Sequence, residues 1–181
     1  LLAVEACLFI YVVFLVPYRD MMPAVAQDVL GVGASGLGLL TSAVSVGGLL
    51  GTLVVSAKGE LRPRGLFLLG SALLEGVGVA FFARSRVFGL SLLLLAAAGL
   101  GRGLFIPLNN TLLQVYARRE MRARAVGMNM FIWSLQPFGS IALGALSDRL
   151  GPSIAIFGAA LTGAGLLLVS GLSSARLRRL E

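Results

Sequence analysis

The sequence predicts an all-α membrane protein whose chain crosses the bilayer six times. Of its 181 residues, 57% are apolar and only 13% are charged, and the mean hydropathy is +0.94. Soluble domains average roughly 45–50% apolar and about 25% charged residues, and a domain of ~150 residues buries only about 70% of its extended-chain surface. Because a core of this size cannot hide so much apolar surface, we expect the lipid bilayer to cover the rest.

Six apolar stretches lie between clusters of charged residues, and each approaches or exceeds the about 20 residues that a spanning helix needs. We expect helices over residues 1–18, 36–57, 66–83, 87–117, 125–147 and 152–173. The first stretch contains Glu5 and the fourth, which is long enough to tilt or to extend past the membrane, contains Arg102. The connections are short, so residues 1–181 form one transmembrane domain.

The basic residues lie mostly on one side of the predicted bundle. Ten of them fall in alternate connections and the C-terminal tail, namely Lys58, Arg62, Arg64, Arg118, Arg119, Arg122, Arg124, Arg176, Arg178 and Arg179, against four at the opposite ends, Arg19, Arg84, Arg86 and Arg149. The positive-inside rule places the ten, and with them the C-terminus, in the cytoplasm. The formal net charge of +7 then reflects membrane orientation, and no nucleic-acid partner is predicted.

The residue counts exclude several kinds of chemistry. The chain has no histidine and a single cysteine, Cys7, which excludes histidine triads, histidine metal sites and an internal disulfide. We predict no metal and no cofactor. A membrane-embedded enzyme would need a nucleophile with a base or two neighbouring carboxylates, and Glu5, Glu75 and Asp148 show no such spacing.

Small residues recur at four-residue spacing in three of the predicted helices. These are Ala43, Gly47 and Gly51 in the second, Ser140 and Gly144 in the fifth, and Ala155, Ala159 and Gly163 in the sixth. Small residues at i and i+4 let helix backbones approach closely, which drives packing in a membrane. Static packing explains the pattern; a smooth face on which helices rock is the alternative interpretation.

The two halves of the chain resemble each other slightly. A shift of 89 residues superposes the first three predicted helices on the last three and pairs identical residues at several positions, among them Pro63 with Pro152 and Gly76 with Gly165. Units of three helices have opposite orientations in the membrane, and inverted three-helix repeats are typical of transporters.

Three stretches carry a resemblance to a known family. They are Pro17–Leu53, Leu112–Val115 with the basic residues up to Arg124 and then Gly127-Met128, and Gly144–Gly151, which ends in Asp148-Arg149-Leu150-Gly151. Together they resemble helices seven to twelve of major facilitator superfamily transporters, most narrowly the bacterial branch of enterobactin-type siderophore exporters and macrolide-efflux proteins.

The chain also departs from the pattern of that branch. Tyr116-Ala117 stands where a proline is usual, the loop Lys58–Arg64 has no aspartate, and the Asp148-Arg149-x-Gly151 loop motif falls on the outer side by the charge count. These differences count against a complete cytoplasmic gating clasp in this half.

The resemblance implies a C-terminal half built of two inverted three-helix repeats. It further implies a secondary active, proton-coupled exporter of small amphipathic molecules, of drug or siderophore type, that works by alternating access in the bacterial inner membrane. Its partners would be an N-terminal six-helix half of the same chain, a small-molecule substrate and protons. The start at Leu1 without Met is interpreted as the interior of a longer protein. A six-helix scaffold without transport activity is the alternative.

Arg102 is the most informative residue of the predicted membrane interior. A central arginine costs about 2.5–3.5 kcal/mol on insertion scales, so it needs a partner or water. Gly101 and Gly103 leave room beside it for another backbone or a ligand. By the resemblance, the first and fourth helices line the central cavity, which makes Glu5 a candidate partner. The alternatives are that each side chain snorkels inward or pairs with a residue in the other half.

Glu75 lies midway along the third predicted helix. Desolvation disfavours its charged form, so we expect a protonated or hydrogen-bonded carboxyl. A proton carrier is one interpretation, but the resemblance places this helix outside the cavity ring and favours a structural role.

Amides and one indole complete the candidate cavity residues. Asn109, Asn110 and Gln114 follow Pro107, which removes a helix hydrogen bond, and they either face water or satisfy the freed backbone. Asn129, Trp133 and Gln136 share a helix face that suits an amphipathic substrate, with lipid-facing packing as the alternative. Tyr18 and Tyr116, at helix ends, are predicted interfacial residues.

Overall fold

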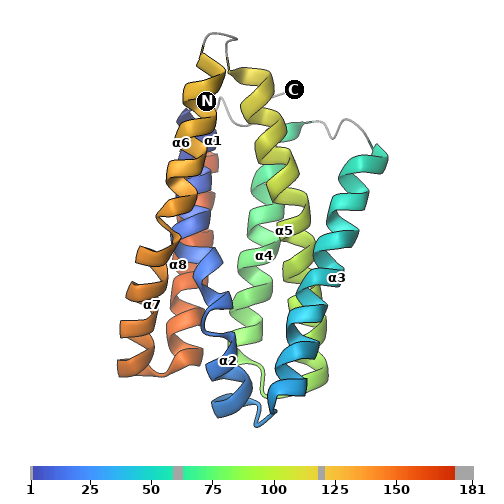
Figure 1. Cartoon of the computed structure of the whole chain (residues 1–181), viewed down its shortest axis with the longest axis vertical. Coiled ribbons are helices and arrows are strands. Elements are labelled where there is room, and N and C mark those ends of the chain that lie inside the picture. The colour runs from blue at the N-terminus through green and yellow to red at the C-terminus, as the bar shows by residue number, and fades with distance from the viewer. Residues whose placement is uncertain (1, 59–62, 118–120, 174–181) are drawn as a thin grey trace.

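The computed structural model describes residues 2–58, 63–117 and 121–173, and these residues form a bundle of long helices without a strand (Figure 1). The elements are α1 (Leu2–Ile10), η1 (Tyr11–Leu15), η2 (Val16–Arg19), α2 (Met22–Ala24), η3 (Val25–Val29), α3 (Ala34–Lys58), α4 (Arg64–Arg84), α5 (Phe88–Tyr116), α6 (Arg122–Ser134), α7 (Gln136–Leu150) and α8 (Pro152–Ser173). The predicted all-α class is confirmed.

Six helical runs among the described residues are long and apolar enough to cross a membrane. They are Val4–Val29, Ala34–Lys58, Arg64–Arg84, Phe88–Tyr116, Arg122–Leu150 and Pro152–Gly171. The start of α1 and the end of α8 lie at the same end of the bundle, as six crossings require (Figure 1). Several residues of the charge count, Arg62, Arg118, Arg119, Arg176, Arg178 and Arg179, lie outside the described residues.

The first span is longer and less regular than its predicted range 1–18. Helical structure continues to Val29 through a π-helical turn (η1), a 3₁₀ turn (η2), a hydrogen-bonded turn at Asp20-Met21, the short α2 and a second π-helical turn (η3). Pro17 and Pro23 each lie in the first turn of a new segment, where the missing N–H is tolerated. The predicted boundary at residue 18 was too early, because Arg19 and Asp20 interrupt the apolar sequence but do not end the helical span.

The fifth span is two helices, not the single helix predicted over 125–147. α6 ends at Ser134 and α7 begins at Gln136, because Pro137 lacks the N–H that would continue the α6 hydrogen-bond ladder. Asp148 and Arg149 lie in the last turn of α7 and are exposed, so they are not loop residues. Gly151, with φ of 84°, makes the turn into α8.

Glycines bring α3, α5 and α4 into backbone contact. A Cβ on Gly47 would overlap the Ala96 carbonyl oxygen, and a Cβ on Gly99 would overlap that of Val44. Gly101 faces the other neighbour, since a Cβ there would lie 2.6 Å from the carbonyl oxygen of Ser71 on α4. We call the contact of α3, α5 and α4 the glycine seam. The packing predicted for Gly47 and Gly51 matches this contact, and Ala43 packs against the core beside it.

Pro107 lies inside α5 without breaking it. Its missing N–H frees the carbonyl oxygen of Gly103. The hydroxyl of Thr52 on α3 donates a hydrogen bond of 2.9 Å to the carbonyl oxygen of Gly48 on the same helix. It also lies 3.4 Å from the freed carbonyl oxygen of Gly103. The proline therefore adds a polar contact to the glycine seam.

Of the small-residue pair predicted in the fifth span, Gly144 makes no close packing contact among the described residues. A Cβ on Gly144 would meet nothing within 4 Å, whereas one on Gly139 would lie 2.5 Å from the Val13 carbonyl oxygen. Gly139 and the buried Leu143 share the face of α7 that packs on the first span, and Gly144 is turned away from it. Ser140 makes a polar contact instead, since its hydroxyl donates a hydrogen bond to Asp20 Oδ2 at 2.6 Å.

Candidate binding hollow around Arg102

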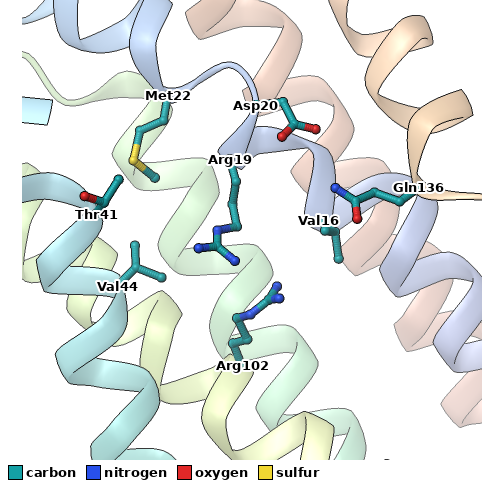
Figure 2. A pocket seen from close by; sticks show the side chains of 8 residues that line it. All are labelled: Val16, Arg19, Asp20, Met22, Thr41, Val44, Arg102 and Gln136. Atoms are coloured by element: carbon teal, nitrogen blue, oxygen red, sulfur yellow. The ribbon is translucent and has the colours of Figure 1, made fainter. Parts of the chain in front are cut away.

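A hollow of about 270 Å³ lies between the first span, α3, α5 and α7. Figure 2 shows its lining: Val16, Arg19, Asp20, Met22, Thr41, Val44, Arg102 and Gln136. The guanidinium groups of Arg19 and Arg102 point toward each other from opposite sides (Figure 2). α4 and α8 contribute no lining residue. We call this cavity the arginine hollow.

Arg102 reaches the hollow from the middle of α5. It follows Phe88, the first residue of α5, by roughly 21 Å at 1.5 Å per residue. Its side chain is half-buried, and its Nη1 atom is buried without a hydrogen-bond partner. The room left by Gly101 and Gly103 is filled by the backbones of α4 and α3. The two glycines therefore fix α5 between α4 and α3. The side chain of Arg102, which lies between them in the sequence, points into the arginine hollow instead.

A buried tyrosine and a buried glutamate lie behind Arg102. The hydroxyl of Tyr11 donates a hydrogen bond of 2.6 Å to Oε2 of Glu75, and neither side chain has exposed surface. The guanidinium of Arg102 is within electrostatic reach of Tyr11, Glu75 and Tyr18. The prediction of a hydrogen-bonded Glu75 is confirmed. Although α4 lies outside the hollow, Glu75 is linked to it through Tyr11 and Arg102.

Tyr11 is the residue that the sequence interpretation missed. Its ring stacks on Phe105 with centroids 4.1 Å apart and meets Trp133 edge-on at 6.4 Å. These rings hold its hydroxyl against Glu75. The available signal was its depth, because a tyrosine in the middle of an apolar span is too deep for the interface and needs a polar partner.

The structure does not pair Glu5 with Arg102. Glu5 is 5% exposed, neither carboxyl oxygen has a hydrogen-bond partner, and it lines a separate hollow of about 480 Å³ with Phe131 and Ile132 of α6. The arginine hollow begins at Val16, eleven residues further along the chain and so roughly 16 Å down a helix. The expected pair is therefore wrong, since the two charges lie at different depths.

The predicted amide residues are scattered. Asn109 and Asn129 are buried, with Oδ1 and Nδ2 respectively lacking a hydrogen-bond partner, while Asn110 and Gln114 are exposed. The interruption at Leu135 divides the expected Asn129–Trp133–Gln136 face. Gln136 lines the arginine hollow (Figure 2), whereas Trp133 contacts Tyr11.

The interfacial role predicted for Tyr18 is wrong. Tyr18 is 1% exposed, and its hydroxyl has no hydrogen-bond partner. The reason is the length of the first span, which continues for eleven residues beyond Tyr18 and places it inside the bundle. Tyr116, at the end of α5, is 37% exposed.

The six apolar crossings, the helix breaks at prolines and the polar hollow between four of the spans define a polytopic α-helical membrane protein. The chain belongs to the Major Facilitator Superfamily, whose family model matches residues 6–174. It is also similar to the multidrug efflux pump Tap of Mycolicibacterium fortuitum, with 32% identity over 116 residues. That stretch is 64% of this chain and 28% of Tap, so the match covers less than a third of the relative.

Proposed function

We propose that the chain is the C-terminal half of a proton-coupled secondary transporter that exports small amphipathic molecules by alternating access. The membership in the Major Facilitator Superfamily and the similarity to a multidrug efflux pump support this proposal. The observation that carries it is the arginine hollow, which is lined by four spans and linked to the buried Glu75 carboxyl through Tyr11 and Arg102. We place the transporter in a bacterial inner membrane with the C-terminus in the cytoplasm, following the charge distribution.

The need for a second six-helix half is supported by the uneven burial of the spans. In the most apolar 18-residue window of each span, 61% of the α4 residues are buried inside the chain. The share is 22% for α3 and only 17% for Arg122–Leu150. Both of these less buried spans line the arginine hollow. A second half that covers α3 and α6–α7 would close the hollow into a central cavity.

Proton coupling is assigned to the Glu75 carboxyl. An ionised Glu75 attracts the Arg102 guanidinium, and protonation removes that attraction. The charged and titratable groups within electrostatic reach of this carboxyl are Tyr11, Arg102, Arg19 and Tyr18. Protonation of Glu75 therefore changes the net charge around Arg102, which links the protonation of one residue to the charge that the hollow presents to a ligand. The structural role that we expected for Glu75 is the alternative to this step.

The test is gradient-driven efflux of a fluorescent dye by the full-length transporter in proteoliposomes. We expect Glu75→Gln to abolish accumulation driven by a pH gradient and to retain dye exchange at equal concentrations. Tyr11→Phe removes the hydrogen-bond donor and gives a partial loss. Ser71→Ala, one turn away on α4 with a hydroxyl bonded only to its own helix, is the matched control.

Unchanged gradient-driven transport in Glu75→Gln would refute the coupling role. A wild-type protein that moves no dye under any gradient would refute transport itself and favour the six-helix scaffold. Covalent modification of the dye would instead favour a membrane-embedded enzyme.

A further inference from the structure

We propose that the arginine hollow binds the anionic group of the transported molecule, so that this transporter selects amphipathic anions. The inference rests on the proposed function and adds the chemical class of the ligand. The observation behind it is the convergence of two guanidinium groups from different elements, Arg19 at the end of η2 and Arg102 in the middle of α5 (Figure 2).

The two arginines outnumber the carboxylates of the lining. Within the described ranges, neither guanidinium forms an ion pair with a carboxylate, and Nη1 of Arg102 has no hydrogen-bond partner. Asp20 is the one carboxylate in the lining, and its Oδ2 atom already accepts the hydrogen bond of Ser140. Glu75 lies behind Arg102 and outside the lining. The lining therefore carries an excess of positive charge.

Two facing cations in a membrane interior repel each other, because the low dielectric strengthens the interaction. An anion between them removes the repulsion and gains two charge-assisted contacts. Guanidinium groups fit carboxylate, phosphate and sulfonate oxygens particularly well, since their planar N–H donors match two oxygens at once. The amide of Gln136 adds a neutral donor at the same cavity.

The remaining lining and the volume define the rest of the ligand. Val16, Met22 and Val44 form an apolar wall next to the two guanidinium groups. The volume of about 270 Å³ is slightly below the roughly 300–1,000 Å³ of sites that enclose drug-sized molecules. The hollow thus accommodates the charged end of an amphipathic molecule and its adjoining apolar part, and the rest of the ligand lies against the other half of the transporter.

The experiment uses two dyes that differ in one charged group. 8-Anilinonaphthalene-1-sulfonate is an anion, and N-phenyl-1-naphthylamine is the same ring system without the sulfonate. The dissociation constant of each dye is measured on the full-length transporter in nanodiscs of phosphatidylcholine, and gradient-driven transport of both is measured in liposomes. We expect Arg102→Gln and Arg19→Gln each to weaken binding of the sulfonate at least tenfold and to change binding of the neutral dye less than twofold. Arg149→Gln, an exposed arginine at the end of α7, is the control and changes neither.

A phospholipid headgroup offers similar anionic chemistry, and a second lipid composition separates the two sources. Phosphatidylglycerol has a net negative charge and repels the sulfonate from all variants alike, so the wild-type protein is compared with Arg102→Gln in each composition. A hollow filled by the anionic lipid would lose this difference in sulfonate affinity in nanodiscs that contain phosphatidylglycerol, and this result would overturn the proposal. A difference that is retained in both compositions supports a transported anion.

Equal losses for both dyes in the two arginine variants would also overturn the inference, because the arginines would then act in packing or in pairing with the other half. Arg102→Lys keeps the charge and separates these cases if Arg102→Gln fails to fold: the proposal expects it to retain the preference for the sulfonate. If the wild-type protein binds the sulfonate through the two arginines but transports neither dye, the proposed function fails while the anion site stands.

Discussion

The two sides of this bundle are built differently. On the glycine seam, α3, α5 and α4 are unbroken helices of 25, 29 and 21 residues whose backbones touch at Gly47, Gly99 and Gly101. On the other side, the first span changes its helical type several times and the fifth is interrupted at Leu135. The arginine hollow lies where the two sides meet, with Thr41 and Arg102 from the seam and Arg19 and Gln136 from the interrupted spans.

This difference in construction predicts that the seam is rigid and that the interrupted spans can move. Close backbone contact leaves the seam little freedom, because packed interiors resist even one extra methyl group. The proline-interrupted spans lack some of the ladder hydrogen bonds that hold a helix straight, and they can bend where these are missing. We infer that the seam acts as the fixed wall of the hollow and the interrupted spans as its movable wall.

The largest effect is expected from an extra methyl group in the seam. Gly99→Ala places a Cβ on the Val44 carbonyl oxygen and forces α3 away from α5. We expect a loss near the upper end of the ~1–3 kcal/mol that overpacking costs, measured as a lower midpoint of thermal unfolding in detergent. Gly89→Ala on the same helix, where a Cβ meets nothing within 4 Å, is the control. An equal midpoint for both variants would contradict the seam.

A smaller effect is expected on the interrupted side. Gly139→Ala places a Cβ 2.5 Å from the Val13 carbonyl oxygen, but its next neighbour is the ring of Pro17 in a segment that can bend. We expect a loss near 1 kcal/mol, at the lower end of the overpacking range, in the same unfolding assay. Gly144→Ala should be neutral or slightly stabilising, and a larger loss there than at Gly139 would reverse the assignment of the packed face.

The smallest effect concerns the hydroxyl that bridges the seam. Thr52→Val keeps the shape of the side chain and removes the hydroxyl that contacts the carbonyl oxygens of Gly48 and Gly103. A net hydrogen bond is worth about 1 kcal/mol, and the 3.4 Å contact contributes only part of that. Thr162→Val is the control, because the Thr162 hydroxyl contacts only Gly158 on its own helix. The difference between the two variants gives the contribution of the contact between α3 and α5 to the free energy of unfolding. Equal midpoints would show that Pro107 leaves no stabilising contact behind.

The sequence predicted the features that stand out against an apolar background. Six spans followed from the charge clusters, and Arg102 and Glu75 were conspicuous because charges are costly inside a membrane. The packing of Gly47 followed from its four-residue spacing. These predictions succeed because each depends on local composition or on the period of a single helix.

The residues that the sequence placed wrongly depend on how helices bend and rotate. Pro17 and Pro137 turn two predicted helices into several segments, which moves Tyr18 into the interior and separates Gln136 from Asn129. The Glu5 pairing failed because depth along a bent span does not follow from residue number. The hollow itself combines residues more than a hundred positions apart, and no local pattern brings Arg19 next to Gln136.

The most direct test of a fixed and a movable wall is thiol labelling at two sites. Cys7 is the single cysteine of the chain, so Cys7→Ala, with any cysteines in the other half replaced, provides the background. Gln136→Cys places a thiol in the arginine hollow on the interrupted fifth span, which belongs to the movable wall, and Ser71→Cys places a thiol in the buried seam between α4 and α5. A water-soluble maleimide should label Gln136→Cys at a rate that changes several-fold when the proton gradient is imposed, and it should leave Ser71→Cys unlabelled in both states. Equal and gradient-independent labelling at the two sites would contradict the account.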